Sequence, residues 1–332
     1  MNIHAKIYVA GHRGLVGSAL MRKLTAEGYG NLLRRSHKEL DLTNQAAVKS
    51  FFVQEQPEYV FLAAAKVGGI LGNSTYPAEF IQKNLAIQTN VIHEAWRAGV
   101  SRLLFLGSSC IYPRECPQPM REEYLLTGPL EATNRPYAVA KIAGIEMCWT
   151  YNRQYGTKYL AVMPTNLYGP GDNYDLETSH VIPALIRKFH EAKVRGAQEV
   201  VVWGTGTPRR EFLYSEDLAD ACLFLMNLPE ESFGTFFNNI SPPLINIGCG
   251  EDLTIRELAQ LVKDVVGFGG SIVWDRTKPD GTPQKLLDVS RMHGLGWQAP
   301  TSFTEGLANA YADYVANIPS TDGGRGCTLR FF

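Results

Sequence analysis

The feature of the sequence that most constrains the fold is a set of three glycines, Gly11, Gly14 and Gly17, directly after a short apolar segment. Residues 6–11, KIYVAG, are typical of a buried strand, and residues 15–28, LVGSALMRKLTAEG, are typical of a helix. Glycines at such a junction permit a tight turn, close packing and contact between a pyrophosphate and free helical N–H groups. The junction therefore predicts a dinucleotide-binding fold. Because the spacing is G-x-x-G-x-x-G, not G-x-G-x-x-G, simple turn glycines remain the alternative.

The alternation of apolar segments and helical patterns continues through the first half of the chain. The segments LLRR, YVFLAAA and RLLFLG read as strands, and each is followed by a helical pattern, the last of which begins at PYAVAKIAG. Such alternation predicts parallel strands joined by helices, and strands with little polar alternation are buried on both faces. We therefore expect an α/β fold: a doubly wound parallel sheet of the Rossmann type, with a smaller C-terminal α/β substrate-binding domain.

Near residue 175 the regular alternation of strand and helix patterns gives way to segments richer in loops, and we place an approximate domain boundary there. Residues 1–175 are expected to form the nucleotide-binding Rossmann domain, with later segments crossing back to it, and residues 176–319 mainly the substrate-binding domain. In the second part, Thr254 and Glu257 have the spacing of a capping box, which predicts a helix start. Residues 320–332 are Gly-rich, and we expect a flexible tail.

Composition argues against several classes of function. The chain has 32 lysines and arginines and 33 aspartates and glutamates, so its net charge is −1 and no broad basic surface for nucleic acid is expected. The sequence shows no signal-peptide pattern and no apolar run of ~18 residues, so we expect a cytoplasmic protein without a membrane span. The six cysteines show no C-x-x-C pair, so we expect no metal site and no disulfide framework, and most should be small buried hydrophobes.

The segment after the first helical pattern indicates which dinucleotide binds. The letters LLRRSHKELDL carry basic side chains where an NAD site would place an acidic residue, and Arg13 lies within the glycine segment itself. Positive charge favours the 2′-phosphate of NADP(H), with solvated surface charges as the alternative. Asp41 comes late enough to bind the adenine amine. The third strand-like segment ends in Ala63, Ala64 and Ala65, which would let the backbone lie against the dinucleotide.

Three further side chains suggest chemistry on a carbonyl group. Ser108 follows the segment RLLFLG, and Tyr137 and Lys141 are four residues apart, hence on one face of a helix. A phenol has a pKa of about 10, so it exchanges protons easily near neutral pH only beside a positive charge, which Lys141 supplies. The serine can hold a substrate carbonyl, and the tyrosine can donate or accept its proton. A surface Tyr–Lys pair is the alternative for the Y-x-x-x-K motif alone.

With these motifs the sequence resembles the extended short-chain dehydrogenase/reductase family, from the glycine segment to about residue 310. The resemblance rests on GHRGLVGSA, LAAAKVGGI, FLGSSCIYP, NRPYAVAKIAGIEMC, VMPTNLYGP, SHVIPALIRKFHEA, VVWGTGTPRREF and KPDGTPQKLLDV. The chain looks similar to those members that invert carbons 3 and 5 of GDP-4-keto-6-deoxy-D-mannose and reduce the ketone at carbon 4 with NADPH. The resemblance therefore implies an NADP-dependent oxidoreductase with epimerase activity, a GDP-sugar substrate and a homodimer.

The resemblance also implies which residues bind the two ligands. For the dinucleotide these are Gly11, Arg13, Gly14, Leu15, Val16, Gly17, Asp41, Leu42, Ala63, Ala64, Ala65, Leu106, Gly107, Ser108, Tyr137, Lys141, Pro164, Asn166, Leu167 and His180. For the nucleotide-sugar they are Lys188, Trp203, Arg210 and Asp280. Lys188 and Arg210 can neutralise a diphosphate, Trp203 can offer a ring face, and Asp280 can accept hydrogen bonds. A solvated helix face is the alternative for Lys188, and Arg209 leaves the choice of arginine open.

The inversion of two carbons gives a reason for the cysteine in GSSCIYP. Each inversion needs a base on one face of the sugar and an acid on the other, while Ser108 and Tyr137 hold the developing oxyanion. Cys110 lies two residues beyond Ser108, and a nearby imidazolium could lower the pKa of the thiol enough to make it a base. By resemblance, His180 is that partner and the acid. From the residues alone, a buried turn thiol and a helix-capping histidine remain the alternatives.

Two rival functions remain open. A sister enzyme of the same fold, such as a 4-epimerase, a 4,6-dehydratase or a simple 4-ketoreductase, would not need the cysteine and histidine pair. A dehydratase usually has an acid/base pair near the tyrosine, whereas Glu131 is the only acid nearby in this sequence. A non-catalytic dinucleotide-binding protein would have little reason to keep Ser108, Tyr137 and Lys141 together.

Overall fold

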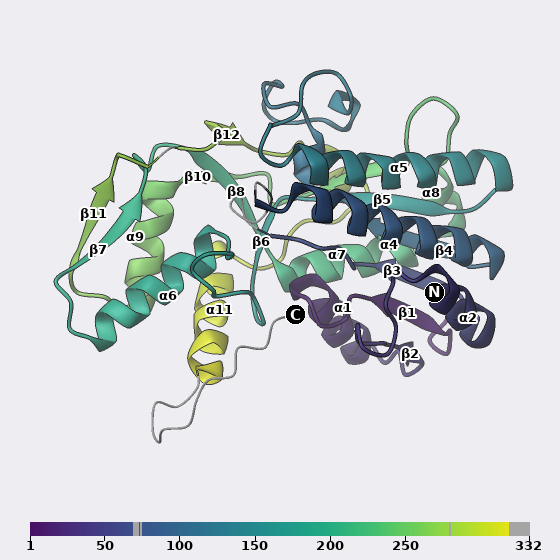
Figure 1. The fold of residues 1–332 in the computed structure, drawn as a ribbon, viewed down its shortest axis with the longest axis horizontal. Helices are drawn as coiled ribbons and strands as arrows, with labels where there is room; N and C mark the ends of the chain where they lie inside the picture. Colours follow the sequence, from purple (N-terminus) through teal and green to yellow (C-terminus); the bar gives the residue numbers. More distant parts are fainter. Residues whose placement is uncertain (69–72, 74, 279, 319–332) are drawn as a thin grey trace.

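The computed structural model describes residues 1–68, 73, 75–278 and 280–318. The predicted tail and Cys327 lie outside these residues. Figure 1 shows a large parallel sheet covered by helices, with a smaller layer of strands and helices beside it.

Six strands form the large sheet, in the order β2-β1-β3-β4-β5-β9, and all neighbours in it are parallel. The strands are β1 (Ile7–Ala10), β2 (Leu32–Leu33), β3 (Tyr59–Leu62), β4 (Arg102–Leu106), β5 (Tyr159–Pro164) and β9 (Leu244–Ile247). The strand order reverses between β1 and β3. In sheets of this kind ligands bind beyond the carboxyl ends of the strands at the reversal, which is where the glycine segment and the three alanines lie.

Helices cover both faces of this sheet, as a doubly wound fold requires. The side chains of Ile7 and Val9 pack with α1 (Leu15–Ala26) and α7 (Ser215–Asn227), and the alternate side chains of Tyr8 and Ala10 face the opposite cluster. That second cluster is covered by α2 (Gln45–Glu55), α4 (Pro77–Arg97) and α5 (Arg135–Tyr155). The predicted α/β fold class is confirmed.

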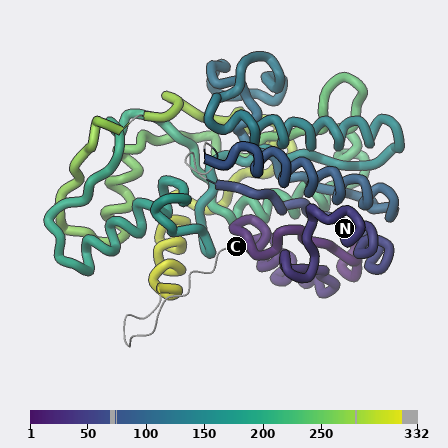
Figure 2. The backbone as a smooth tube through the Cα atoms, in the orientation of Figure 1, coloured from purple at the N-terminus to yellow at the C-terminus, as the bar shows by residue number. Residues whose placement is uncertain are grey.

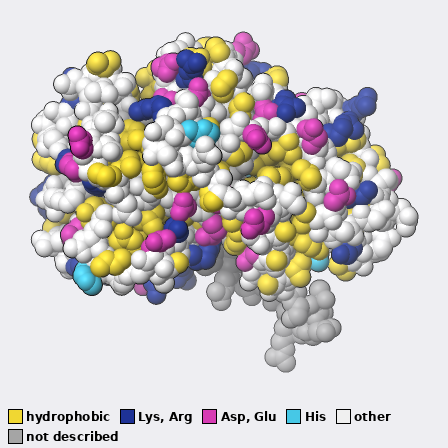
Figure 3. All heavy atoms as spheres, turned by 180° about the vertical axis from the view of Figure 1, so that it is seen from behind, with side chains coloured by type: hydrophobic (Ala, Val, Ile, Leu, Met, Phe, Trp, Pro, Cys, Tyr) yellow, Lys and Arg dark blue, Asp and Glu magenta, His cyan; other side chains and the backbone are white. Residues whose placement is uncertain are grey.

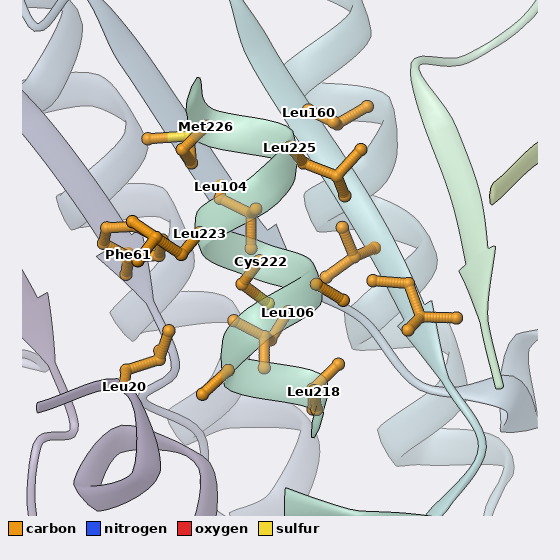
Figure 4. Close-up of a cluster of buried hydrophobic side chains, with 14 of the residues drawn as sticks. Leu20, Phe61, Leu104, Leu106, Leu160, Leu218, Cys222, Leu223, Leu225 and Met226 are labelled. Carbon is orange, nitrogen blue, oxygen red and sulfur yellow. The ribbon is translucent and has the colours of Figure 1, made fainter. Parts of the chain in front are cut away.

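Helix α7 comes late in the sequence and packs on the first half of the chain. Figure 4 shows its side chains Leu218, Cys222 and Leu225 lying against Leu104 and Leu160 of the sheet. All five are buried, and burial of one leucine side chain stabilises the fold by roughly 2 kcal/mol. Together with β9, α7 brings chain from beyond residue 175 into the nucleotide-binding layer.

The smaller layer has its own core. It contains β8 (Arg209–Tyr214) with β6 (Asn166–Tyr168), β10 (Asp252–Thr254) and β12 (Gln284–Lys285), and the pair β7 (Glu199–Trp203) and β11 (Ser271–Asp275). Its helices are α6 (Val181–Val194), α9 (Ile255–Val266) and α11 (Phe303–Asn317). The backbone path in Figure 2 shows that its segments alternate in sequence with those of the large sheet.

Local signals explain several element boundaries. The predicted capping box is confirmed: Glu257 N–H donates to Thr254 Oγ1 at 3.1 Å, and Thr254 N–H donates to Glu257 Oε2 at 2.7 Å. Short helical turns complete the chain at Ser109–Ile111, Glu122–Tyr124, α8 (Glu230–Gly234) and α10 (Ser290–Gly294).

The composition-based expectations can be compared with the described residues. Cysteines 110, 116, 148, 222 and 249 are unpaired, and Cys148 and Cys222 are fully buried. Across the described ranges, no group of three His, Cys, Asp or Glu side chains could hold a metal ion, and no helix is long and apolar enough to cross a bilayer. Figure 3 shows acidic and basic side chains interspersed over one face of the molecule.

Candidate active site

The predicted dinucleotide residues gather along one edge of the large sheet. The glycine segment follows β1, Ala63, Ala64 and Ala65 follow β3, and Gly107 and Ser108 follow β4. Pro164 ends β5, Asn166 and Leu167 lie in the adjoining β6, and Leu42 lies in the segment between β2 and α2. Because parallel strands point the same way, their carboxyl ends bring all these segments to the same edge.

The three glycines have different reasons to be glycine. Gly11 has φ +86°, and a Cβ there would lie 2.8 Å from the Cα of Ala64. A Cβ at Gly17 would lie 2.0 Å from the carbonyl oxygen of Gly11, so these two positions are fixed by packing. At Gly14 a Cβ would meet only that same oxygen, at 3.6 Å, so the protein itself leaves room there.

The beginning of α1 is suited to an anion. Gly14 is its N-cap and provides no side chain to cap the first turn, and no acidic residue lies in that turn, which begins at Leu15 and Val16. The free N–H groups and the positive end of the helix dipole therefore remain available to a phosphate. The residues present thus fit the pyrophosphate of a dinucleotide.

The positive charges of two arginines both act on His12, which lies beside this turn. The positive charges of Arg13 and Arg34 contribute, after burial, to lowering the pKa of His12. Neither arginine forms an ion pair with another described residue. Arg35, in contrast, is held by Glu55 at 2.5 Å, so it is not available to a ligand in this conformation.

Asp41 is arranged by a local turn. Its Oδ1 accepts from Thr43 N–H at 2.9 Å and from Thr43 Oγ1 at 2.7 Å, and these bonds lower the pKa of the carboxyl group. His37 lies 3.8 Å from the same oxygen and is exposed. Asp41 is therefore ionised at neutral pH and can accept a hydrogen bond from an amine.

The predicted reactive residues begin where β4 ends. Gly107 packs against Met163, whose terminal methyl would have to move away from a Cβ at this position. Ser108 then caps a short helical turn that starts at Ser109, and its Oγ accepts from Cys110 N–H at 3.5 Å. Since Oγ accepts this bond, its O–H remains a donor, for which the sulfur of Cys110 and a substrate oxygen are the possible acceptors.

Tyr137 and Lys141 lie in the first two turns of α5 and reach the end of β4. Lys141 is 3% exposed, and its Nζ donates to the carbonyl oxygen of Leu106 at 2.7 Å. The same Nζ lies 5.8 Å from the centre of the Tyr137 ring. Burial lowers the pKa of Lys141 to about 8 and raises the pKa of Tyr137 above its ordinary value. The phenol is therefore a proton donor at neutral pH.

Cys110 interacts electrostatically with both of these residues, which places the thiol at the same centre. It influences the pKa values of Tyr137 and Lys141. Burial raises the pKa of Cys110, while a hydrogen bond with Ser108 and the charges of Lys285 and Lys141 act in the opposite direction. No imidazole of the described residues contributes to the pKa of Cys110, so the expectation that one lowers it stays a prediction. Desolvation dominates, and the cations that act on the thiol are lysines.

His180 lies at the N-cap of α6, but its side chain caps no helical N–H group. The imidazole is solvent-accessible, yet the surrounding protein still lowers its pKa by desolvation. No charged group of the described chain shifts that pKa, Cys110 included. Among the described residues the imidazole of His180 therefore caps no helix and responds to no charged group. Its pairing with Cys110 stays a prediction.

The predicted substrate residues lie in the smaller layer. Trp203 ends β7, is 63% exposed, and has the amines of Lys188 and Lys278 over its ring, at 5.4 and 5.2 Å from the ring centre. Lys188 also donates to Val201 O at 3.3 Å. This arrangement presents an aromatic face flanked by two cations, which suits a nucleotide base and its phosphates.

Arg210 and Asp280 lie beside this group. Asp280 accepts from Thr205 N–H at 2.9 Å and from Thr205 Oγ1 at 2.7 Å, and it raises the pKa of Arg210 against the larger effect of burial. Arg209 is paired with Asp252 at 2.7 Å. Of the two adjacent arginines, Arg210 is therefore the one whose guanidinium is not held by a short ion pair.

Two lysines of this site escaped sequence reasoning. Lys278 begins the segment KPDGTPQKLLDV, but nothing in that segment distinguishes it from a surface lysine. Lys285 lies in the segment KPDGTPQKLLDV and lines a small pocket together with Cys110, Glu131 and Arg114. Its place beside Cys110 depends on strand pairing between distant segments, which no local spacing reveals.

Comparisons with known proteins agree on one family. Residues 7–246 match the model of the NAD dependent epimerase/dehydratase family. A GDP-L-fucose synthase 1 from Arabidopsis thaliana is 59% identical over 314 residues, which cover 95% of this chain and 94% of the relative. A GDP-L-fucose synthase from Escherichia coli (strain K12) is 54% identical, with 94% of this chain and 97% of the relative covered.

The chain is also similar to solved structures of enzymes that act on GDP-sugars. A GDP-D-glycero-L-gluco-heptose synthase from Campylobacter jejuni, solved in the presence of NADPH, matches with a TM-score of 0.88 and 39% identity. The match covers 95% of this chain and 99% of that chain.

Proposed function

Because the chain belongs to the NAD dependent epimerase/dehydratase family, we propose that it carries out the reaction named for its relatives, the synthesis of GDP-L-fucose. It inverts carbons 3 and 5 of GDP-4-keto-6-deoxy-D-mannose and reduces the ketone at carbon 4. The cofactor is a nicotinamide dinucleotide, and bound NADPH supplies the hydride that carbon 4 receives.

The observation that carries this function is the thiol of Cys110 on the turn that begins at Ser108. A simple reductase needs a hydroxyl, a phenol and a lysine, which Ser108, Tyr137 and Lys141 provide. A base that inverts the neighbouring carbons is an additional requirement. Cys110 is half-buried and interacts with Tyr137 and Lys141, so the base lies beside the group that polarises the carbonyl.

Inversion proceeds through an enolate. The Cys110 thiolate takes the proton from carbon 3 or carbon 5, the C–H electron pair becomes the C=C bond, and the carbonyl π electrons move onto oxygen. The Ser108 and Tyr137 O–H groups donate to that oxygen and stabilise its charge. An acid on the opposite face then returns a proton to the carbon, the carbonyl re-forms, and the configuration is inverted. We assign the acid to His180, whose imidazole is uncommitted.

For reduction the same donors serve a second purpose. Hydride addition at carbon 4 places a negative charge on the carbonyl oxygen, which takes the phenolic proton of Tyr137. Lys141 stabilises the resulting phenolate by its charge, and it holds its place through the bond to Leu106. Two of the three N–H groups of its ammonium remain for the ribose of the dinucleotide.

We propose that NADP(H) is preferred over NAD(H). Arg13 and Arg34 act on one point beside the helix that receives the pyrophosphate, and a 2′-phosphate there would pair with both. The GDP portion of the substrate would use the Trp203 ring with Lys188 and Arg210. Asp280 would accept hydrogen bonds from the sugar hydroxyls or the guanine edge.

Sister reactions fit the site less well. A 4-epimerase returns its hydride to the same substrate, and a dehydratase uses an acid/base pair near the tyrosine. Glu131 is not placed for that role, because its Oε2 accepts from Thr133 N–H at 3.0 Å and from Asn134 N–H at 3.1 Å. A reductase of the kind seen with GDP-heptoses would keep the fold and would not require exchange at carbons 3 and 5.

We also propose that the protein is a cytoplasmic homodimer. The outer surfaces of α4 and α5 share an aromatic cluster in which Trp96 and Tyr155 stack at 4.1 Å, and Tyr155 is 43% exposed. A second copy would cover these rings. Light scattering behind a sizing column should give a molar mass of two chains for the wild type. For Tyr155→Arg the measured mass should fall towards that of one chain.

The experiment that tests the function follows solvent exchange. The protein is incubated with GDP-4-keto-6-deoxy-D-mannose in deuterated water without NADPH, and carbons 3 and 5 are read by NMR. We expect deuterium at both carbons. Cys110→Ser should lose this exchange by at least 100-fold and still reduce the ketone of the already epimerised sugar. NADPH consumption with no exchange at either carbon would mean a plain ketoreductase.

A further inference from the structure

Lys285 is a charged side chain that the mechanism above does not use, and its charge acts on the reactive thiol. It lines the same pocket as Cys110. In the described part of the chain it forms neither an ion pair nor a hydrogen bond, although it is only partly exposed. An amine with no partner inside a pocket is costly to keep unless its charge has a use.

The position of Lys285 is built by strand pairing. Strand β12 runs parallel to β8, with Lys285 opposite Arg210, and Arg209 N–H donates to Pro283 O at 2.8 Å. The fully buried Glu211 accepts from Leu287 N–H at 2.9 Å and so holds the end of this segment.

The other side of the segment is joined to the loop that follows Cys110. Leu286 N–H donates to Gln118 Oε1 at 2.9 Å, and Met120 N–H donates to Leu286 O at 2.7 Å. The loop carrying the thiol and the strand carrying the lysine are thus attached to each other directly. Lys285 is therefore held beside Cys110 by backbone bonds on both sides.

Several titratable groups lie near the thiol. They are Lys141 and Tyr137 from α5, Lys285 from β12, and Arg114 and Glu131 from the pocket wall. The ammonium group of Lys141 already donates to the carbonyl oxygen of Leu106 and lies near Tyr137. The carboxylate of Glu131 accepts a hydrogen bond from the backbone at the start of α5. Among the charges that act on the thiol, that of Lys285 has the largest effect, and it outweighs that of Lys141.

We propose that Lys285 is a positioning residue for epimerisation: its ammonium group stabilises the thiolate form of Cys110, against the burial that favours the thiol, before proton abstraction. This inference rests on the proposed function, because only epimerisation needs the thiolate. The lysine does not exchange protons with the sugar; the proton moves from carbon to sulfur, and the positive charge of Lys285 balances the negative charge of the sulfur before that transfer.

The test reads the thiol without any substrate. Alkylation of Cys110 by iodoacetamide is followed against pH by mass spectrometry of its peptide, in the ligand-free wild type and in Lys285→Met, Lys285→Arg and Lys49→Met. Lys49 is an exposed lysine of α2 and is the matched control. We expect the midpoint of Lys285→Met to rise by about one pH unit, a roughly tenfold loss of thiolate near neutral pH. Lys285→Arg and Lys49→Met should stay near the wild type.

A second measurement separates this role from simple substrate binding. In deuterated water at pH 7, exchange at carbons 3 and 5 should be about tenfold slower in Lys285→Met than in the wild type, and the exchange rate should recover at higher pH. The rate of reduction of the epimerised ketone should stay within twofold of the wild type. An unchanged alkylation midpoint, or a raised KM for the GDP-sugar with that midpoint unchanged, would overturn the proposal. If the wild type itself shows no exchange, the proposed function fails, while the alkylation profile still reports on Lys285. NADPH affinity equal to the wild type verifies folding, and Lys285→Gln replaces Lys285→Met if that variant does not fold.

Discussion

The buried ammonium group of Lys141 makes the stability of the protein depend on pH in a way that can be measured. Its pKa falls from 10.5 to about 8 because the side chain is buried. The folded chain therefore releases this proton at lower pH than the unfolded chain does. Between pH 8 and 10.5 the unfolded chain binds more protons, so stability rises with pH over that window.

The magnitude follows from the size of the shift. Below pH 8 both states are protonated and the folded state bears the full cost of the buried charge, about 3 kcal/mol at 1.36 kcal/mol per pH unit. Integration over the two pKa values gives a gain of ~2 kcal/mol for the wild type between pH 7 and pH 9.5. Lys141→Met removes the titration. It also removes the bond to Leu106, but that loss is a constant offset between pH 7 and 9.5.

The assay compares urea unfolding of Lys141→Met with the wild type at pH 7, 8, 9 and 9.5. The variant should be most stable relative to the wild type at pH 7, and this advantage should shrink by ~2 kcal/mol at pH 9.5. Lys49→Met, an exposed lysine changed in the same way, should show no such slope. A difference between Lys141→Met and the wild type that stays constant within ~0.5 kcal/mol would refute the reasoning.

Three other outcomes test individual contacts. Gly17→Ala would place a Cβ 2.0 Å from Gly11 O, so the free energy of unfolding should fall by at least ~2 kcal/mol and the affinity for NADPH should also fall. Gly14→Ala should weaken NADPH binding but keep the free energy of unfolding within ~0.5 kcal/mol of the wild type. Equal stabilities of the two variants in urea unfolding would contradict this. Arg34→Ala should raise the KM for NADPH at least tenfold and leave the KM for NADH within twofold; equal effects would mean that no 2′-phosphate binds there. Trp203→Leu should raise the KM for the GDP-sugar about tenfold at nearly constant kcat, and a purely kcat effect in steady-state assays would show that the ring does not bind the substrate.

Local sequence patterns were sufficient for four strands of the large sheet, β1, β2, β3 and β4. The glycine segment, the apolar strands and the capping box each follow from the chemistry of a few neighbouring residues, and Gly11 and Gly17 have the packing that the pattern predicted. The spacing of Tyr137 and Lys141 likewise needs only a helix. Apart from the contact of Gly11 with Ala64, these predictions depend on contacts between residues that are close in sequence.

The environment of the thiol could not be predicted in the same way. Lys285 reaches Cys110 because β12 pairs with β8 and with the loop near Met120, and all of these partners are remote in sequence. The direction in which the pKa of Cys110 shifts could not be predicted for the same reason. Its value depends on burial and on remote cations, not on the residues beside it in the chain.

The central claim is that one site inverts two carbons and reduces a third, and the isotopic content of the product tests it most directly. The product is made with unlabelled NADPH in deuterated water and analysed by mass spectrometry and NMR after its O–H and N–H positions are returned to hydrogen. The account predicts GDP-L-fucose with deuterium at carbon 3 and at carbon 5 and hydrogen from NADPH at carbon 4. A reduced GDP-sugar with no deuterium at carbons 3 and 5 would contradict it.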